Sequence, residues 1–159
     1  MVINFANTTD GRIIHDLMIQ AFMEYNHEIP PSSALEETAQ SVSDALEEEE
    51  EGLIAYEGNK PVGMVRFHIK NKNLYFYRLS VIPEERGKGI AKKILTFLEN
   101  YANKEGLSSI RCKVRMNAPK NIKLYSSIGY DVYDEEVVHK PNGINIKVVS
   151  MKKDLLLLQ

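Results

Sequence analysis

Apolar and polar residues alternate with two periods along this chain, and the changes of period divide it into helices and strands. In four segments the apolar residues recur every three or four positions, which places them on one face of a helix. In seven shorter segments they alternate with polar residues or form short continuous runs, as in half-buried and buried strands. Glycine, proline and asparagine mark most of the boundaries.

The order of these segments predicts the fold class. We expect helices at about residues 13–25, 35–46, 90–101 and 122–128, and strands at about residues 2–5, 53–56, 62–70, 74–82, 109–116, 131–139 and 144–152. The strands at 74–82 and 109–116 are joined through a helix, so we expect them to be parallel. The chain is therefore predicted to be an α/β protein with a mixed antiparallel-parallel sheet of about seven strands flanked by about four helices.

Length and composition set the broad class. The 159 residues predict one domain spanning residues 1–159, with an ordinary globular content of hydrophobic residues, 43%. Met1–Phe5 shows no signal-peptide pattern, and no run approaches the roughly 18 apolar residues needed to cross a bilayer. The single cysteine, Cys112, alternates with apolar residues, which predicts a buried and inert thiol rather than a nucleophile. We therefore expect a cytoplasmic protein with no membrane partner.

The charged residues change this picture only slightly. The formal net charge is −2, which gives no general attraction to nucleic acid. Five consecutive acids, Glu47–Glu51, follow the second predicted helix. The helix dipole disfavours negative charge at that end, so we expect a frayed, solvated acidic face there.

The segment Leu79–Ala91 carries the clearest chemical signal. An apolar strand stops at Pro83, a basic glycine turn follows, and a helix begins after it. Gly87 and Gly89 allow the backbone to approach a bulky anion, and Arg86 and Lys88 add positive charge. Together with the free N–H groups of the helix N-terminus, they predict a phosphate or pyrophosphate site.

Two familiar phosphate motifs are missing from this segment. No Gly-Lys pair is followed by Ser or Thr, as a nucleoside-triphosphate loop requires. Lys92 occupies the position of the third glycine of the dinucleotide-binding pattern. Nucleotide hydrolysis and nicotinamide chemistry are therefore disfavoured.

Two motifs together resemble the GCN5-related N-acetyltransferase (GNAT) family. Arg86–Ala91 is similar to its Arg/Gln-x-x-Gly-x-Gly/Ala pyrophosphate loop, and Asn117–Tyr130 is similar to its Asn…Leu-Tyr-x-x-x-Gly-Phe segment. The order of elements is also the family's order. Asn121 departs from the pattern, since alanine is usual there, and Tyr130 replaces the usual phenylalanine.

The resemblance implies acetyl-CoA as a co-substrate and a set of residues that hold it. In this family the fourth and fifth strands splay apart at a bulge, and the pantetheine arm lies in the gap. Backbone groups of Leu79, Ser80 and Val81 would hold the pantetheine amides and polarise the thioester carbonyl. Residues of the turn and the helix start would hold the pyrophosphate: Arg86, Gly87, Lys88, Gly89, Ile90 and Ala91. Asn117 and Asn121 would make additional contacts to the cofactor arm.

Tyr125 is the catalytic residue that the resemblance implies. Its phenol, with a reference pKa of about 10, would act as the general acid for the departing thiolate. Spacing alone favours a different interpretation, in which Tyr125 is a core aromatic of an amphipathic helix. Glu24, His27 and Glu28 are candidates for the base, although they could equally be exposed charges at a helix end.

Alternating rows of polar residues on three strands give information about the molecule that would accept the acetyl group. Arg111, Lys113 and Arg115 lie opposite an apolar row, and Arg66 and Arg78 alternate with apolar residues in the same way. A shared basic face would suit an acceptor that carries a carboxylate. The alternative is that these residues pair with acids of the first two helices or face solvent.

The function expected from these observations is transfer of an acetyl group from acetyl-CoA to a primary amine of a small molecule or peptide, by direct attack and without metal. A non-catalytic acyl-CoA sensor of the same fold is the alternative. A nucleic-acid partner is disfavoured by the net charge and by the lack of a basic reading helix. A homodimer is compatible with the sequence.

Overall fold

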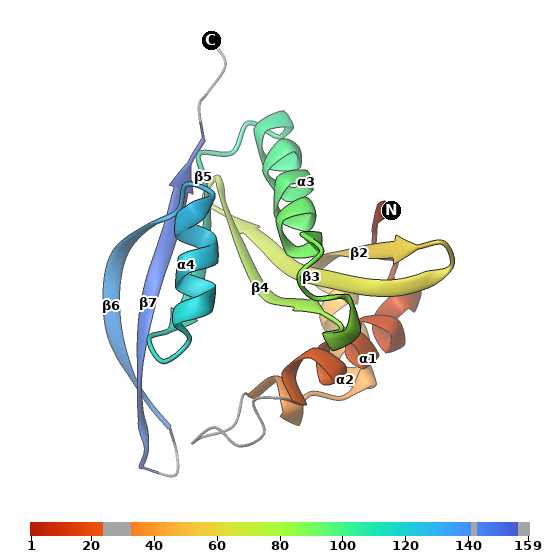
Figure 1. Ribbon diagram of the computed structural model, residues 1–159, viewed down its shortest axis with the longest axis horizontal. Helices are drawn as coiled ribbons and strands as arrows, with labels where there is room; N and C mark the ends of the chain where they lie inside the picture. Colours follow the sequence, from red (N-terminus) through yellow and green to blue (C-terminus); the bar gives the residue numbers. More distant parts are fainter. Residues whose placement is uncertain (24–32, 141–142, 156–159) are drawn as a thin grey trace. The chain divides into compact units, whose positions relative to one another are not determined.

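The computed structural model describes residues 1–23, 33–140 and 143–155 (Figure 1). Eleven helices and strands follow one another in the predicted order, with short 3-10 helices at Thr8–Asp10, Ser33–Glu36 and Pro83–Glu85. They are β1 (Val2–Phe5), α1 (Gly11–Phe22), α2 (Ala39–Glu47), β2 (Glu51–Glu57), β3 (Lys60–Lys70), β4 (Asn73–Val81), α3 (Ile90–Lys104), β5 (Ser109–Arg115), α4 (Pro119–Ser127), β6 (Asp131–His139) and β7 (Asn145–Asp154).

The strands form one seven-stranded sheet in the order β1-β2-β3-β4-β5-β7-β6. β4 and β5 are parallel, whereas β1–β2, β2–β3, β5–β7 and β6–β7 are antiparallel. The predicted fold class, a mixed sheet with four α-helices, is therefore confirmed. The described residues contain no helix that is both long and apolar enough to cross a membrane.

The chain divides into two compact units, which are described separately. Unit 1 comprises Met1–His68 and Phe76–Leu98, and unit 2 comprises Ile69–Tyr75 and Glu99–Gln159. β3, β4 and α3 each contribute to both units, because the divisions fall after His68, Tyr75 and Leu98.

In unit 1, α1 and α3 lie against opposite faces of β3. Arg66 on β3 reaches the sulfur of Met18 in α1, whereas a side chain at Gly63, three residues earlier, would point at Ile90 and Ile94 of α3. Residues three apart on a strand point to opposite faces, so the two contacts define the two layers. α1 presents its apolar stripe to the sheet and buries Ile14, Leu17, Met18 and Ala21.

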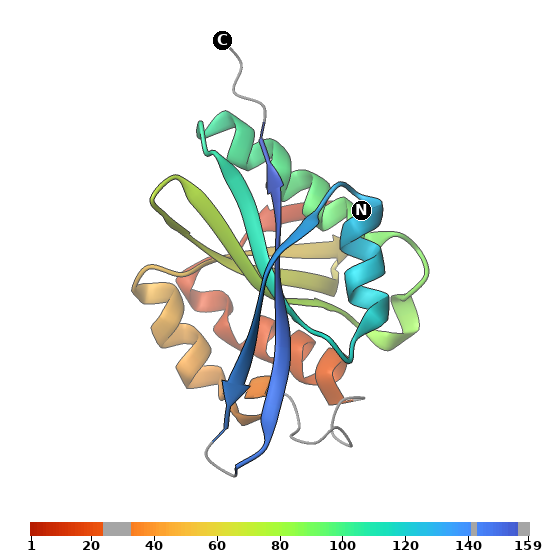
Figure 2. The same ribbon diagram turned by 90° about the vertical axis from the view of Figure 1, so that its left-hand side faces the viewer.

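In unit 2, β5, β7 and β6 form an antiparallel ribbon, and β6 and β7 are drawn as a long curved hairpin in Figure 2. β5 buries Ile110, Cys112 and Val114, as the alternation predicts. Burial raises the pKa of the Cys112 thiol to about 12, so this thiol stays protonated near neutral pH. The predicted burial of Cys112 is confirmed.

Three local predictions were wrong. The second predicted helix is broken: a 3-10 turn ends at Glu36, and α2 begins only after Thr38, whose side chain caps it by accepting from the Ser41 N–H (3.0 Å). Met116, expected in the apolar row of β5, lies beyond the strand and is 42% exposed. Glu51 belongs to β2 rather than to a frayed helix end, because the strand begins within the acidic run.

Candidate active site

The end of β4 in unit 1 contains a distorted backbone at Arg78. Before this point, β4 and β5 pair residue by residue: Asn73 with Ser109, Leu74 with Ile110, and Tyr75 with Arg111. Arg78 has φ 57°, a left-handed conformation that costs a non-glycine residue roughly 1–2 kcal/mol. Leu79, Ser80 and Val81 follow directly, so the predicted pantetheine-binding stretch begins immediately after a strained residue.

After β4, the chain forms the predicted glycine turn. Gly87 and Gly89 have φ of 81° and 76°, and a Cβ at either position would meet nothing within 4 Å. The need for glycine here is therefore conformational, and the space next to the backbone is open. The Lys93 N–H donates to the Gly89 carbonyl (3.1 Å), which starts α3 and leaves the N–H groups of its first turn without acceptors in the helix. This geometry fits a bound anion.

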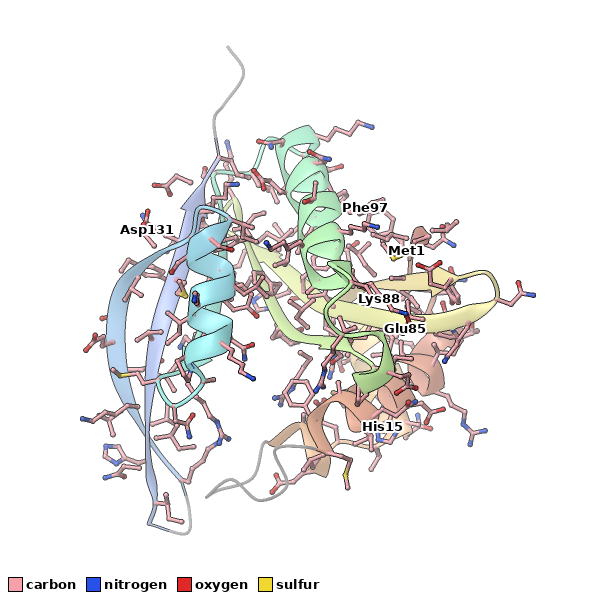
Figure 3. The ribbon with its side chains drawn as sticks, viewed as in Figure 1. Met1, His15, Glu85, Lys88, Phe97 and Asp131 are labelled. Atoms are coloured by element: carbon pink, nitrogen blue, oxygen red, sulfur yellow. The ribbon has the colours of Figure 1, made fainter. Side chains whose placement is uncertain are left out.

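The two basic side chains of the turn have protein partners. Arg86 donates to two backbone carbonyls, that of Ala21 in α1 (2.9 Å) and that of Val81 (3.4 Å). Lys88 donates to Glu85 (2.7 Å), and Figure 3 shows these two side chains close together before α3. The hydrogen bond raises the pKa of Lys88 and lowers that of Glu85. Arg86 is thus held against the fold, whereas Lys88 is an exposed cation in a surface ion pair.

Gly63, which the sequence analysis did not single out, positions the start of α3. A Cβ at Gly63 would lie 3.0 Å from the Ser80 carbonyl oxygen and within 3.2 Å of side-chain atoms of Ile90 and Ile94. Only glycine allows the first turns of α3 to approach β3 and the end of β4 this closely. The sequence did contain a signal for this close approach, because a glycine inside a strand pattern often marks a place where another segment packs closely.

Four polar residues form a buried cluster beside β3 and β4: Arg66, Glu37, Glu50 and Tyr77. The Arg66 side chain is 4% exposed and donates through Nε to Glu50 (2.9 Å) and through Nη1 to both Glu37 oxygens (2.9 Å each). The Tyr77 hydroxyl donates to the second oxygen of Glu50. The expected solvated acidic face is therefore wrong for Glu50, whose side chain is 7% exposed.

The electrostatics of this cluster keep Arg66 charged and Tyr77 neutral. Burial lowers the pKa of Arg66, but its hydrogen bonds to Glu50 and Glu37 raise it by more. Burial and the Glu50 carboxylate raise the pKa of Tyr77 well above its usual range. The cluster therefore pairs the Arg66 guanidinium with two carboxyl groups, and Arg78, which bonds Glu37 through Nε (3.2 Å), supplies a second guanidinium.

These contacts bear on the two interpretations of the basic strand faces. Arg66 and Arg78 both pair with acids, and those acids flank α2. The strict alternation of side chains between the two faces of β4 is wrong at one step. Tyr77 and Arg78 are consecutive, but both side chains reach the cluster, because the left-handed conformation of Arg78 shifts the pleat of the strand.

In unit 2, α4 carries the expected catalytic residue. Tyr125 is 7% exposed, and its ring centroid lies 5.9 Å from that of Tyr130. Asn121 lies one helical turn before Tyr125 on the same face of α4, and Asn117 is exposed before the helix begins. Unit 2 thus brings Asn121 and Tyr125 together, as unit 1 brings Leu79–Val81 and the turn together.

The basic row of β5 also has partners within unit 2. Lys113 forms an ion pair with Glu136 of β6 (2.7 Å), and the Arg111 guanidinium lies 5.1 Å from the centre of the Tyr133 ring. Acidic and aromatic side chains of β6 therefore balance the cations of β5.

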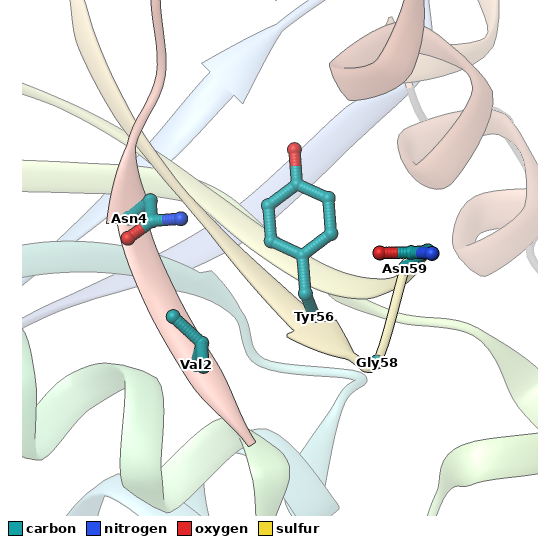
Figure 4. Close-up of a pocket in the computed structure, with 5 residues that line it drawn as sticks. All are labelled: Val2, Asn4, Tyr56, Gly58 and Asn59. Carbon is teal, nitrogen blue, oxygen red and sulfur yellow. The ribbon is translucent and has the colours of Figure 1, made fainter.

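The other parts of the described chain that could form a binding site contain none of the predicted site residues. A depression lined by Val2, Asn4, Tyr56, Gly58 and Asn59 contains none of the predicted site residues (Figure 4). Within residues 1–23, 33–140 and 143–155 there is no group of His, Cys, Asp and Glu side chains arranged to hold a metal ion. The candidate bases Glu24, His27 and Glu28 lie outside the described residues.

Comparisons with known proteins identify the family. The sequence matches the model of the Acetyltransferase (GNAT) family over residues 14–130. It is 31% identical over 98 residues to the uncharacterized N-acetyltransferase YjcF of Bacillus subtilis (strain 168), covering 62% of this chain and 68% of that protein.

Solved structures show the same fold. The ribosomal-protein-S18-alanine N-acetyltransferase from Escherichia coli has a TM-score of 0.80 at 16% identity, covering 99% of this chain and 96% of that one. PaiA N-acetyltransferase from Thermoplasma acidophilum, solved in complex with coenzyme A, has a TM-score of 0.78 at 17% identity, covering 98% and 100%. With its mixed sheet, its glycine turn before α3 and its match over most of its length, the chain belongs to the GNAT acetyltransferase family.

Proposed function

We propose that this protein is an N-acetyltransferase that moves an acetyl group from acetyl-CoA to a primary amine of a small molecule or peptide. The observation that carries the proposal is the turn between β4 and α3, where two glycines with positive φ leave open space beside the first N–H groups of a helix. This arrangement suits a pyrophosphate, and acetyl-CoA carries one.

The residues of unit 1 would bind the donor. N–H groups from Gly87 to Ala91 would hold the pyrophosphate, with Lys88 free to turn from Glu85 toward it, because that ion pair is exposed. Arg86 would support the turn through its bonds to two backbone carbonyls rather than by touching the anion first. Backbone groups of Leu79, Ser80 and Val81 would hold the pantetheine arm, and Asn117 and Asn121 of unit 2 would add contacts to it.

The chemistry needs one acid and no enzyme nucleophile. The donor supplies an activated thioester; the amine nitrogen forms a bond to its carbonyl carbon, and the carbon–sulfur bond breaks. A backbone N–H of Leu79–Val81 would stabilise charge on the carbonyl oxygen, an effect worth roughly 3 kcal/mol in comparable sites. Tyr125 would donate its proton to the sulfur, and the amine would lose a proton to a base. Cys112, buried and protonated, takes no part.

A direct assay tests this proposal. The protein is mixed with acetyl-CoA and a panel of primary amines that includes polyamines, amino acids and peptide N-termini, and the release of free thiol is followed. Amine-dependent release supports the proposal. Tight binding of acetyl-CoA with no release for any amine would favour the sensor alternative, and no binding would contradict both.

The turn makes a prediction of its own. Gly89→Ala is expected to weaken acetyl-CoA binding about five-fold, because alanine at φ 76° costs about 1 kcal/mol and shifts the turn away from the conformation that exposes its N–H groups. Isothermal titration calorimetry measures the change in Kd.

Gly58→Ala is the matched control for this prediction. Gly58 has φ 58° in the turn between β2 and β3, and a Cβ there also meets nothing within 4 Å. The same backbone strain should lower stability to a similar degree and leave the Kd unchanged. Equal effects of both variants on the Kd would show that the Gly89 turn does not contact the donor.

A further inference from the structure

Glu37 connects three elements of unit 1. Its carboxylate accepts from Arg66 on β3 and from Nε of Arg78 on β4 (3.2 Å). Its backbone carbonyl lies 2.9 Å from Nε2 of His15 in α1; since a carbonyl can only accept, His15 donates through Nε2. Glu37 stands between the 3-10 turn that ends at Glu36 and the Thr38 cap of α2, so its backbone position is also defined.

Arg78 needs such a partner. A left-handed, non-glycine residue persists only where its surroundings determine its conformation. Two contacts do so here: the Glu37 bond to the side chain and the hydrogen bond that Ser80 Oγ donates to the Arg78 carbonyl (2.8 Å). Ser80 is 2% exposed, so this second contact is shielded from water.

We propose that Glu37 is a positioning residue that holds Arg78 in its left-handed conformation and thereby fixes the backbone of Leu79–Val81. The inference rests on the proposed function only for its catalytic consequence, namely that this backbone presents N–H groups to the thioester. Glu37 does not act as the base, because both carboxylate oxygens already accept hydrogen bonds from arginines.

The test combines substitutions at both positions. Glu37→Ala is expected to lower kcat/KM for acetyl-CoA about ten-fold, because the left-handed Arg78 loses the bond that compensates for its strain. In an Arg78→Gly background the same substitution should change kcat/KM less than about two-fold, because glycine adopts positive φ without help. Arg78→Val should lose more activity than Arg78→Gly, although both remove the charge, because a β-branched residue resists this conformation.

Stability separates positioning from general structural damage. Glu37→Ala removes a partner of buried Arg66 in both backgrounds, so the thermal midpoint should fall in both. Only the effect of Glu37→Ala on kcat/KM should differ between the unsubstituted protein and the Arg78→Gly variant. Glu36→Ala, at the exposed neighbouring position, is the matched control and should change neither quantity. If Glu37→Ala lowers kcat/KM equally in both backgrounds, Glu37 acts in another way and the inference is overturned.

A second measurement does not depend on catalysis. Hydrogen exchange of the backbone over residues 79–82, which includes the Ile82 N–H bonded to the Val62 carbonyl (3.0 Å), should accelerate about ten-fold in Glu37→Ala and much less in Glu37→Ala/Arg78→Gly. This pattern would support the inference even if no amine is acetylated. Unchanged exchange in Glu37→Ala would overturn it, whatever the protein's activity.

Discussion

Replacing Arg66 by alanine is expected to lower the free energy of unfolding by about 3–5 kcal/mol, because it leaves the buried Glu50 carboxylate without its cation. Arg66 is 4% exposed and bonds Glu50 and Glu37 at 2.9 Å. Glu37 keeps Arg78 as a partner in the variant, but Glu50, with a side chain 7% exposed, keeps only the Tyr77 hydroxyl among its partners in the described part of the chain. Urea denaturation followed by circular dichroism measures the loss.

Lys113→Ala is the control, since it also removes a cation bonded to a carboxylate. The Lys113–Glu136 pair has a comparable distance, 2.7 Å, but its side chains are 65% and 40% exposed. Water replaces the lost partner there, and the expected cost is below about 1 kcal/mol. If Arg66→Ala costs no more than Lys113→Ala, burial does not determine the importance of these ion pairs.

Tyr125→Phe is expected to lower turnover at least about ten-fold with little change in the affinity for acetyl-CoA. The substitution keeps the ring that packs beside Tyr130 and removes only the hydroxyl, the group proposed to protonate the thiolate. The loss should therefore appear in kcat, measured by thiol release, and not in the Kd measured by calorimetry.

Tyr130→Phe tests whether any hydroxyl in this part of unit 2 would have the same effect. Tyr130 is 2% exposed and is the aromatic neighbour of Tyr125, and the resembling family motif has phenylalanine at its position. We expect turnover in Tyr130→Phe to be within about two-fold of the unsubstituted protein.

Unchanged turnover in Tyr125→Phe would remove Tyr125 from the mechanism and leave it the core aromatic that its spacing suggests.

The fold was largely predictable because it depends on local patterns that each segment carries itself. The periods identified four helices and seven strands, and the helix between β4 and β5 implied their parallel pairing. The errors occurred where tertiary contacts outweigh local preference. Glu37 and Glu50 lie at the two ends of α2, and it is the buried Arg66 that removes them from solvent; no periodicity in their own segments indicates a cation on β3.

The candidate site was predictable in one part and not in another. The glycine turn was visible because positive φ at Gly87 and Gly89 has a residue signature. The left-handed Arg78 has no such signature, since arginine is uncommon in that region. Its conformation depends on a carboxylate 41 residues earlier in the chain, and such a partner cannot be identified from spacing.

The bond between Arg86 and the Ala21 carbonyl also has a consequence for the order in which the chain folds. α1 has no basic residue in its last turn, so the guanidinium that satisfies one of its terminal carbonyls comes from 65 residues further along the sequence. Closing so long a loop is slow compared with forming the helix itself. The last turn of α1 therefore becomes stable late, at the stage when the segment after β4 takes its place, and the two should form and melt as one cooperative element.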